Sequence, residues 1–215
     1  MNLLALSTSG PLPSAALFIN GRLAHAALGQ GGKTHSETLM PFVEQVLVSA
    51  GLAPNLVDTY AVDIGPGSFT GVRIGVCTAN ALAMAQNRPV VGVSSLRGLA
   101  QGLSGSVCSL LDCRNGNGYA MLLFDGEVFM PESAVVISEF LKDPPAGTTF
   151  VGDGAVLHRQ AIQEAVSGAR FVDDNTVTAV KIGLCAFGMP TAEREALPLY
   201  IRPSQAERLY GGKQL

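Results

Sequence analysis

The most informative stretch of the chain spans residues 63–75 and reads DIGPGSFTGVRIG. It follows an apolar run, Thr59 to Ile64, that predicts a strand, and it opens a segment that predicts a helix from Thr70 to about Gln86. A glycine-rich turn between strand and helix places backbone N–H groups and the helix dipole where they can hold an anion. The run matches neither GxxxxGK[ST] nor GxGxxG. Two interpretations stay open, a tight turn and a vestigial phosphate loop formed by Gly65, Gly67 and Ser68.

Two helices near this stretch are unusually apolar. The helix predicted over 70–86 carries one charged residue, Arg73, and fits both a core helix and an exposed interface helix. An earlier helix is predicted from near Thr34 to before Gly51, with Thr34 and Glu37 spaced as a capping box. Its apolar side chains cover roughly 160° of the helical wheel, wider than the ~100° stripe of an ordinary surface helix. We therefore expect this helix to contact two neighbours.

The arrangement of strands appears twice in the sequence. Near the N-terminus, apolar runs flank Asn20-Gly21, a pair that favours a hairpin turn, and a similar set flanks Asp125-Gly126 about 105 residues later. The repeat indicates two related lobes, although common hairpin signals can also coincide. We predict an α/β protein with two lobes, each a mixed β-sheet with flanking helices, over residues 1–101 and 102–215, with the terminal segment packing back on the first lobe.

Composition narrows the kind of protein. The chain has 215 residues, 47% of them hydrophobic and only 14% charged, so much apolar surface must be buried in the fold or against another protein. A net charge of -3 disfavours direct nucleic-acid binding. The four cysteines show no CxxC spacing, and the sequence contains neither an apolar run long enough to span a membrane nor a basic leader. We expect a cytoplasmic protein without membrane contact.

The usual catalytic patterns are absent from the sequence. His25, His35 and His158 are scattered without metal-ligand spacing, and the run from Gly92 to Leu96 breaks the GxSxG pattern at its last position. Asp112 lies beside Arg114 and fits a Mg²⁺ ligand, an ion pair or a turn, whereas the corresponding place after the first strand has serines and a threonine instead of a carboxylate. We therefore predict no catalytic residue and no metal site in this chain.

The stretch 63–75, together with GVSSL at 92–96, resembles the TsaB (YeaZ) family of bacterial tRNA threonylcarbamoyladenosine synthesis. Further matches to the family pattern are His35-Ser36-Glu37 with Pro41, Leu111-Asp112 with Arg114, Gly152-Asp153-Gly154, and Pro198 to Arg202. The resemblance is dense up to about Arg114 and thinner afterwards. It implies an actin-like (ASKHA, RNase H-like) fold.

The resemblance also implies a role as the catalytically silent paralogue that dimerises with the catalytic subunit TsaD, joined by the ATPase TsaE. In that family TsaD modifies an adenosine beside the anticodon of tRNAs reading codons that begin with A. ATP and metal would belong to the partner subunits, and tRNA would be met only through the complex. Ser95 and Leu99 stand where the catalytic paralogue has metal-binding histidines, and Ser7 and Asn80 also depart from the family pattern. A stand-alone actin-like ATPase or kinase and a glycoprotease-like peptidase remain as alternatives.

Family members pair through the first two helices of the N-terminal lobe, which agrees with the apolar character of both helices here. We expect a homodimer through the same face when the chain is alone. The predicted interface anchors are Leu39, Met40, Val43, Leu47, Val72, Val76 and Ala79.

Overall fold

The structure is a computed structural model that describes residues 1–31, 34–189 and 194–202. In this part of the chain, the first of two five-stranded sheets has the order β3-β2-β1-β4-β5. Strands β1 to β3 form an antiparallel meander, and β4 and β5 extend it in parallel. The strands span Asn2–Ser7, Ser14–Ile19, Arg22–Leu28, Thr59–Asp63 and Val90–Val93. The predicted hairpin is confirmed, with Asn20 and Gly21 both at positive φ.

The second sheet repeats this design. Its order is β10-β9-β6-β7-β8, so β6 to β8 form the antiparallel meander and β9 and β10 add in parallel. The strands span Ser106–Asp112, Asn117–Phe124, Glu127–Val136, Thr149–Val151 and Arg170–Phe171. Listed from β8 to β10, the order matches that of the first sheet strand for strand. The prediction of two related lobes is therefore confirmed, whereas the exact domain bounds stay a prediction.

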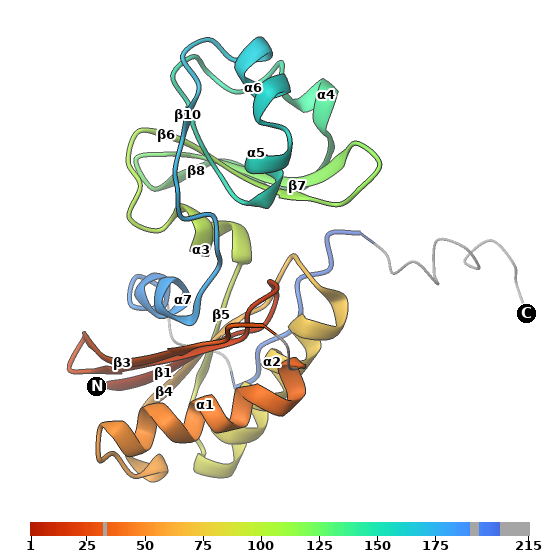
Figure 1. Ribbon diagram of the computed structural model, residues 1–215. Helices are drawn as coiled ribbons and strands as arrows, with labels where there is room; N and C mark the ends of the chain where they lie inside the picture. Colours follow the sequence, from red (N-terminus) through yellow and green to blue (C-terminus); the bar gives the residue numbers. More distant parts are fainter. Residues whose placement is uncertain (32–33, 190–193, 203–215) are drawn as a thin grey trace, which may run out of the picture.

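The molecule is a stack of layers (Figure 1). Helices α1 (His35–Ser49) and α2 (Phe69–Gln86) cover one face of the first sheet, and α3 (Ser95–Ala100) and α7 (Ala179–Ala186) lie between the two sheets. The outer face of the second sheet carries α4 (Ile137–Phe140), α5 (Asp153–Leu157) and α6 (Arg159–Ala165). A short 3₁₀ helix at Pro54–Leu56 completes the elements. Among the residues that the structure describes, three hydrophobic cores fill the spaces between these layers.

Both predicted helices of the first lobe are confirmed. Thr34 is the N-cap of α1, and it forms the expected capping box with Glu37. Ser68 is the N-cap of α2, and its Oγ accepts a hydrogen bond from the backbone N–H of Gly71. A side chain at Gly71 would collide with the carbonyl oxygen of Thr8, so glycine there lets α2 lie directly against the loop after β1. No helix in the described ranges is long and apolar enough to cross a membrane.

Residues 194–202 form an extended segment, called the strap below, that crosses α2 toward the second lobe. Asn80 binds it twice, donating from Nδ2 to the carbonyl of Ala196 and accepting at Oδ1 from the N–H of Ala196, both at 2.9 Å. The N–H of Leu199 donates to the carbonyl of Ile64 at 2.8 Å. At its end Arg202 donates from Nη2 to Oδ1 of Asn117 in the second lobe, at 3.0 Å. The strap thus joins the two lobes along α2.

Candidate partner-binding face and interlobe cleft

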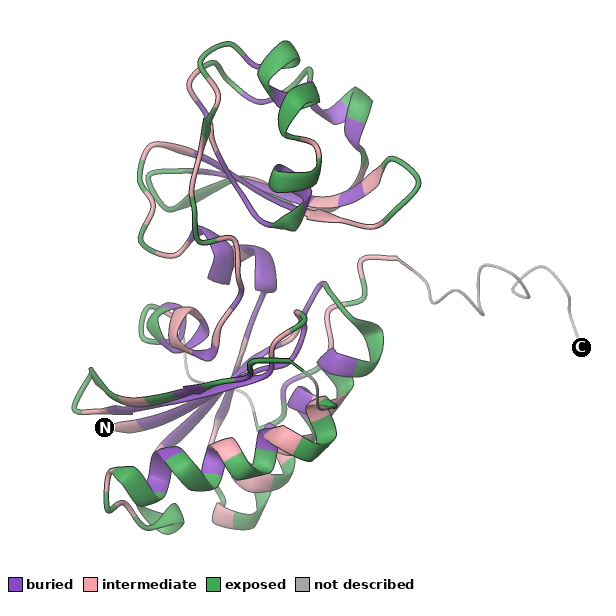
Figure 2. Cartoon of the chain, viewed as in Figure 1, coloured by how far each residue is buried: buried purple, intermediate pink, exposed green. Residues whose placement is uncertain are grey.

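The outward surface of α2 is largely apolar, whereas that of α1 mixes apolar side chains with polar and charged ones such as Glu44 and Gln45. Figure 2 shows each helix with a buried side toward the sheet and an exposed side toward solvent. On α1 the exposed apolar side chains are Met40 and Val48, 47% and 72% exposed, and on α2 Met84 is 80% exposed. From the exposed residues of the two helices we select the set Met40, Val48, Cys77, Ala81 and Met84 and call it the α1–α2 face.

The predicted interface anchors differ in how far the structure exposes them to solvent. Met40 is exposed as an anchor would be, whereas the other six lie in the core between the helices and the first sheet. Leu39, Val43, Leu47, Val72, Val76 and Ala79 are each at most 7% exposed. Side chains packed inside one chain offer no surface to another. Partner binding through these helices stays a prediction, and the exposed side chains named above are the ones that would carry it.

Asp63, at the end of β4, is fully buried and surrounded by hydroxyl groups. Its Oδ2 accepts from Ser7 Oγ at 2.8 Å and from Ser9 Oγ, and its Oδ1 accepts from Ser95 Oγ at 2.5 Å and from the N–H of Gly65 at 3.0 Å. Burial raises the pKa of the Asp63 carboxyl, and the hydrogen bonds act in the opposite direction. The carboxylate is therefore enclosed by the protein's own donors.

The sequence singled out Ser7 as a departure from the family pattern and Ser95 as the position of a metal-binding histidine in the catalytic paralogue, but it did not connect the two serines. The ends of β1, β4 and β5 lie side by side because these strands are neighbours in the sheet, and this brings both serines to one carboxylate. The adjacency of strand ends was the available signal, since β1 and β4 are parallel. In the described structure, the side chains at these strand ends form hydrogen bonds with one another.

A cleft of about 980 Å³ opens between the lobes. The first lobe contributes the β4–α2 turn and His35, whose Nε2 donates to the carbonyl of Gly10 at 2.8 Å. The second lobe contributes acidic and basic side chains, and Arg202 of the strap also lines the cleft. The lining residues from the two lobes include Ser9, Gly67, Ser68, Asp112, Cys113, Arg114, Tyr119 and Asp153.

Asp112 and Ser68, which the sequence singled out and which line this cleft, are both engaged within the chain. Asp112 accepts at Oδ1 from Nε2 of His158, at 3.0 Å, and at Oδ2 from the backbone N–H of Arg114, at 2.9 Å. Asp112 thus shapes the turn after β6 instead of pairing with the Arg114 side chain. Ser68 donates its N–H to the carbonyl of Ser9 and caps α2 with its hydroxyl. Within residues 1–31, 34–189 and 194–202, no three potential metal ligands come together. Phosphate binding at Gly65, Gly67 and Ser68 stays a prediction.

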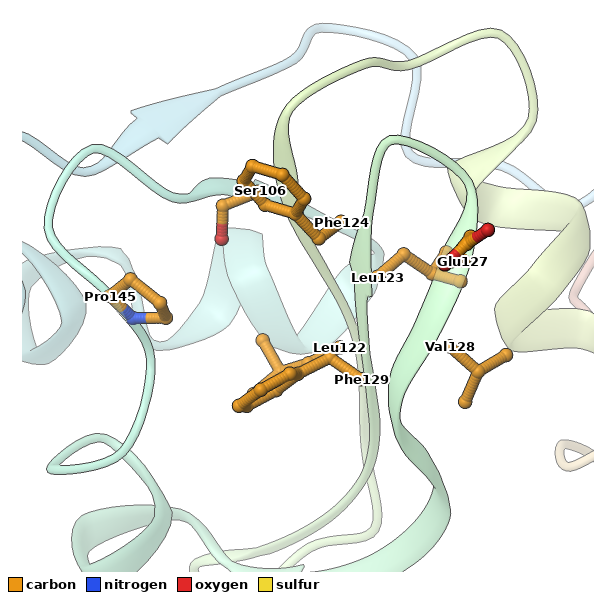
Figure 3. Close-up of a pocket in the computed structure, with 8 residues that line it drawn as sticks. All are labelled: Ser106, Leu122, Leu123, Phe124, Glu127, Val128, Phe129 and Pro145. Atoms are coloured by element: carbon orange, nitrogen blue, oxygen red, sulfur yellow. The ribbon is translucent and has the colours of Figure 1, made fainter.

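A smaller cavity of about 400 Å³ lies in the second lobe beside the β7–β8 hairpin (Figure 3). Leu122, Phe129 and Pro145 contribute to its wall, and Glu127 is its charged lining residue. Because its lining is mostly apolar and few polar groups converge there, it is less suited to a polar ligand than the interlobe cleft.

Comparison with known proteins shows which family the chain resembles. The family model for TsaD, described as tRNA N6-adenosine threonylcarbamoyltransferase, matches residues 25–171. The tRNA threonylcarbamoyladenosine biosynthesis protein TsaB of Bacillus subtilis is 33% identical over 170 residues, 74% of this chain and 74% of that protein. The TsaB protein of Haemophilus influenzae is 41% identical over 102 residues, but the matched part spans only 47% of this chain and 42% of that protein.

Solved structures point to the same family as the sequence relatives. YeaZ from Pseudomonas aeruginosa superposes with a TM-score of 0.76 at 29% identity, over 93% of this chain and 99% of that chain. The activator of 2-hydroxyisocaproyl-CoA dehydratase from Clostridium difficile shares the fold alone, with a TM-score of 0.50 at 11% identity over 87% and 95% of the two chains.

Two lobes of matching topology around a shared cleft define a protein of the actin-like class, which confirms the predicted fold. Within that class the sequence and structural relatives are more particular. The chain belongs to the TsaB (YeaZ) family, as its motifs predicted.

Proposed function

We propose that the chain acts in the biosynthesis of threonylcarbamoyladenosine in tRNA as a non-catalytic subunit that binds a TsaD homologue through the α1–α2 face. The observation that carries this proposal is the set of large apolar side chains that α1 and α2 leave exposed to solvent, namely Met40, Val48 and Met84. Membership of the TsaB family supports this pathway, and the match to the TsaD family model is consistent with a partner that resembles this chain.

The chemistry of this face favours a protein partner. Helix α2 has one charged residue, Arg73, along its 18 residues, and the net charge of the chain is -3. Nucleic-acid binding depends mainly on basic side chains that meet phosphates, whereas the cores of protein interfaces are poor in charge and rich in Met and aromatic residues. We infer that tRNA meets this chain only through the complex.

A supporting rather than catalytic role is consistent with the strand ends of the first lobe. Actin-like kinases and ATPases use acidic groups near the cleft to manage metal-bound phosphate. Here Asp63 is buried and accepts hydrogen bonds from three serines and one backbone N–H, so its oxygens are already occupied.

The proposal also includes further partners. We propose that a TsaE homologue joins the complex and that ATP and metal are held by the partner subunits. When TsaD is absent, we expect the chain to form a homodimer through the same face.

The test is co-purification with the TsaD homologue of the same organism, followed by calorimetric titration. The wild-type chain should form a defined complex. Met84→Glu and Val48→Glu, both at exposed positions, should abolish it while leaving the thermal unfolding midpoint near that of wild type, because a buried carboxylate at an interface has no water and no partner. Phe129→Glu is the matched control, since Phe129 is 74% exposed on the second lobe.

Retained binding by both folded α1–α2 variants would show that this face is not the interface. Failure of the wild type to bind TsaD, together with ATP turnover by the chain alone, would replace the proposal with the actin-like ATPase alternative. Loss of binding by Phe129→Glu as well would point to a non-specific effect of the added charge.

A further inference from the structure

An aromatic clamp lies at the N-terminal end of α2, where the strap crosses the helix. The guanidinium carbon of Arg73 lies 3.9 Å from the centre of the Phe69 ring and 5.7 Å from that of Tyr200. The two rings are 5.3 Å apart, and Arg73 donates from Nε to the Tyr200 hydroxyl at 2.8 Å. Phe69, Arg73 and Tyr200 are called the arginine clamp below.

The charge of the arginine clamp is held in place but not neutralised. A guanidinium has five N–H donors, of which Tyr200 takes one. Among the described residues no carboxylate forms a salt bridge with Arg73. Stacking on aromatic faces fixes the plane of the guanidinium and leaves its outer fork free for a planar, doubly hydrogen-bonded acceptor. The clamp is therefore preorganised for a carboxylate.

The strap makes the clamp a fixed part of the surface. Tyr200 follows Leu199, whose N–H donates to the carbonyl of Ile64. Ala196 is buried, and its backbone forms one donated and one accepted hydrogen bond with the Asn80 side chain. Phe69 and Tyr200 nevertheless remain 42% and 49% exposed. Rigid, half-exposed aromatic and arginine side chains are the residues that dominate binding energy at protein interfaces.

The clamp is continuous with the α1–α2 face. Arg73, Cys77, Ala81 and Met84 are exposed and follow one another at intervals of four, four and three residues, so they lie on one side of α2. Arg73 is the one charged position in this row. A partner covering the row would have to meet that cation or leave it desolvated and unpaired, which is costly.

We propose that the arginine clamp is a second contact region of the partner face and that it receives an aspartate or glutamate side chain of the partner subunit. The inference rests on the proposed function, because it assumes the same partner on the same side of α2. The clamp would select a partner by charge, whereas the apolar side chains of the α1–α2 face would supply most of the buried area.

The experiment titrates the TsaD homologue into wild type, Arg73→Met, Arg73→Lys and Arg88→Met at low and moderate salt. Arg73→Met should weaken binding by about tenfold or more, since removal of one partner from an enclosed charge pair leaves the other unpaired. Arg73→Lys should fall between Arg73→Met and wild type, because lysine keeps the charge but not the planar fork. Arg88 is an exposed arginine beyond the end of α2, so Arg88→Met should bind like wild type.

Salt provides a readout that a structural role of Arg73 would not give. Wild-type affinity should fall as salt rises, and the fall should be smaller for Arg73→Met. Binding of Arg73→Met within about twofold of wild type, with Met84→Glu still inactive, would overturn the clamp inference and leave the proposed function standing. Absence of wild-type binding would instead overturn the proposed function, and the clamp inference with it. Should Arg73→Met fail to fold, a wild-type affinity that does not change with salt would contradict the inference by itself.

Discussion

At the scale of single residues, the surroundings of Asp63 explain why serine occupies positions 7, 9 and 95. A buried carboxylate is tolerated where its oxygens are hydrogen-bonded, and here three serine hydroxyls and the N–H of Gly65 donate to it. Three small hydroxyl side chains fit at the crowded strand ends, where two of the three, Ser7 and Ser95, are completely buried. The serines therefore have a structural reason to be where they are, independent of any ligand.

Asp63 should make stability depend on pH in a direction unusual for a carboxylate. Its pKa in the folded state is raised above the usual value of 3.8, so between 3.8 and the raised pKa the folded chain binds more protons than the unfolded chain. The free energy of unfolding should then decrease as pH rises through this window, by at most about 1.4 kcal/mol per pH unit for one proton. Urea unfolding of wild type and Asp63→Asn across this range should show the decrease in the wild type and its loss in the variant.

Asparagine suits this comparison because its amide can still meet all four groups: the oxygen accepts from Ser95 and Gly65, and the amide N–H groups donate to rotated serine hydroxyls. Asp63→Ala would leave several buried donors unsatisfied and should destabilise the fold by about 3 kcal/mol or more. Identical pH profiles for wild type and Asp63→Asn would mean that Asp63 keeps an ordinary pKa in the folded chain.

At the scale of elements, turn and cap signals predicted the first lobe well because they are local. Thr34 with Glu37 marks the start of α1, and Asn20-Gly21 marks the first hairpin, each through chemistry confined to a few residues. The assignment of Val72 and Val76 as surface anchors had no such support. Hydrophobicity does not distinguish a side chain facing its own sheet from one facing a partner, so the six buried anchors and the exposed Met84 look alike in sequence.

From the sequence we expect the terminal segment to pack back on the first lobe, but the contacts of the strap leave no local signal, since its hydrogen-bond partners Ile64, Asn80 and Asn117 lie 85 or more positions away. Asn80, which departs from the family pattern, pairs with both backbone groups of Ala196 across 116 positions. A side chain that binds the backbone N–H and C=O of a distant residue, as a neighbouring strand would, produces no hydrophobic periodicity in the sequence. Only the folded chain brings residue 80 and residue 196 together.

Removal of the Asn80 side chain should release the strap. Asn80→Ala loses two hydrogen bonds and should lower the free energy of unfolding by about 1 to 3 kcal/mol. Trypsin should then cut after Arg194 faster than in wild type, because Arg194 lies at the N-terminal end of the strap. Thr78→Ala is the matched control, since Thr78 Oγ1 donates to the carbonyl of Ile74 within α2 and does not touch the strap. Equal cleavage rates in Asn80→Ala and wild type would show that Asn80 does not hold the segment.

At the scale of the whole molecule, the uncovered α1–α2 face leads to a prediction about the chain alone. We expect the purified protein to be a homodimer at micromolar concentration, because two copies can bury Met40, Val48 and Met84 against each other. Light scattering should give twice the mass of 22.3 kDa for wild type and for Phe129→Glu, and the single mass for Met84→Glu. A monomeric wild type would contradict this expectation without bearing on binding to TsaD.

The position of α7 has a consequence for the order in which the chain is completed during synthesis. This helix, at Ala179–Ala186, packs on β1, β2 and β4 at the opposite end of the sequence, with Gly183 against the ring of Phe18 and the N–H of Ala179 bound to Ser14. A ribosome therefore releases all five strands of the first sheet long before the helix that covers their inner face. The second lobe is contiguous in sequence and can close first, so the half of the protein made earliest is the half that finishes last.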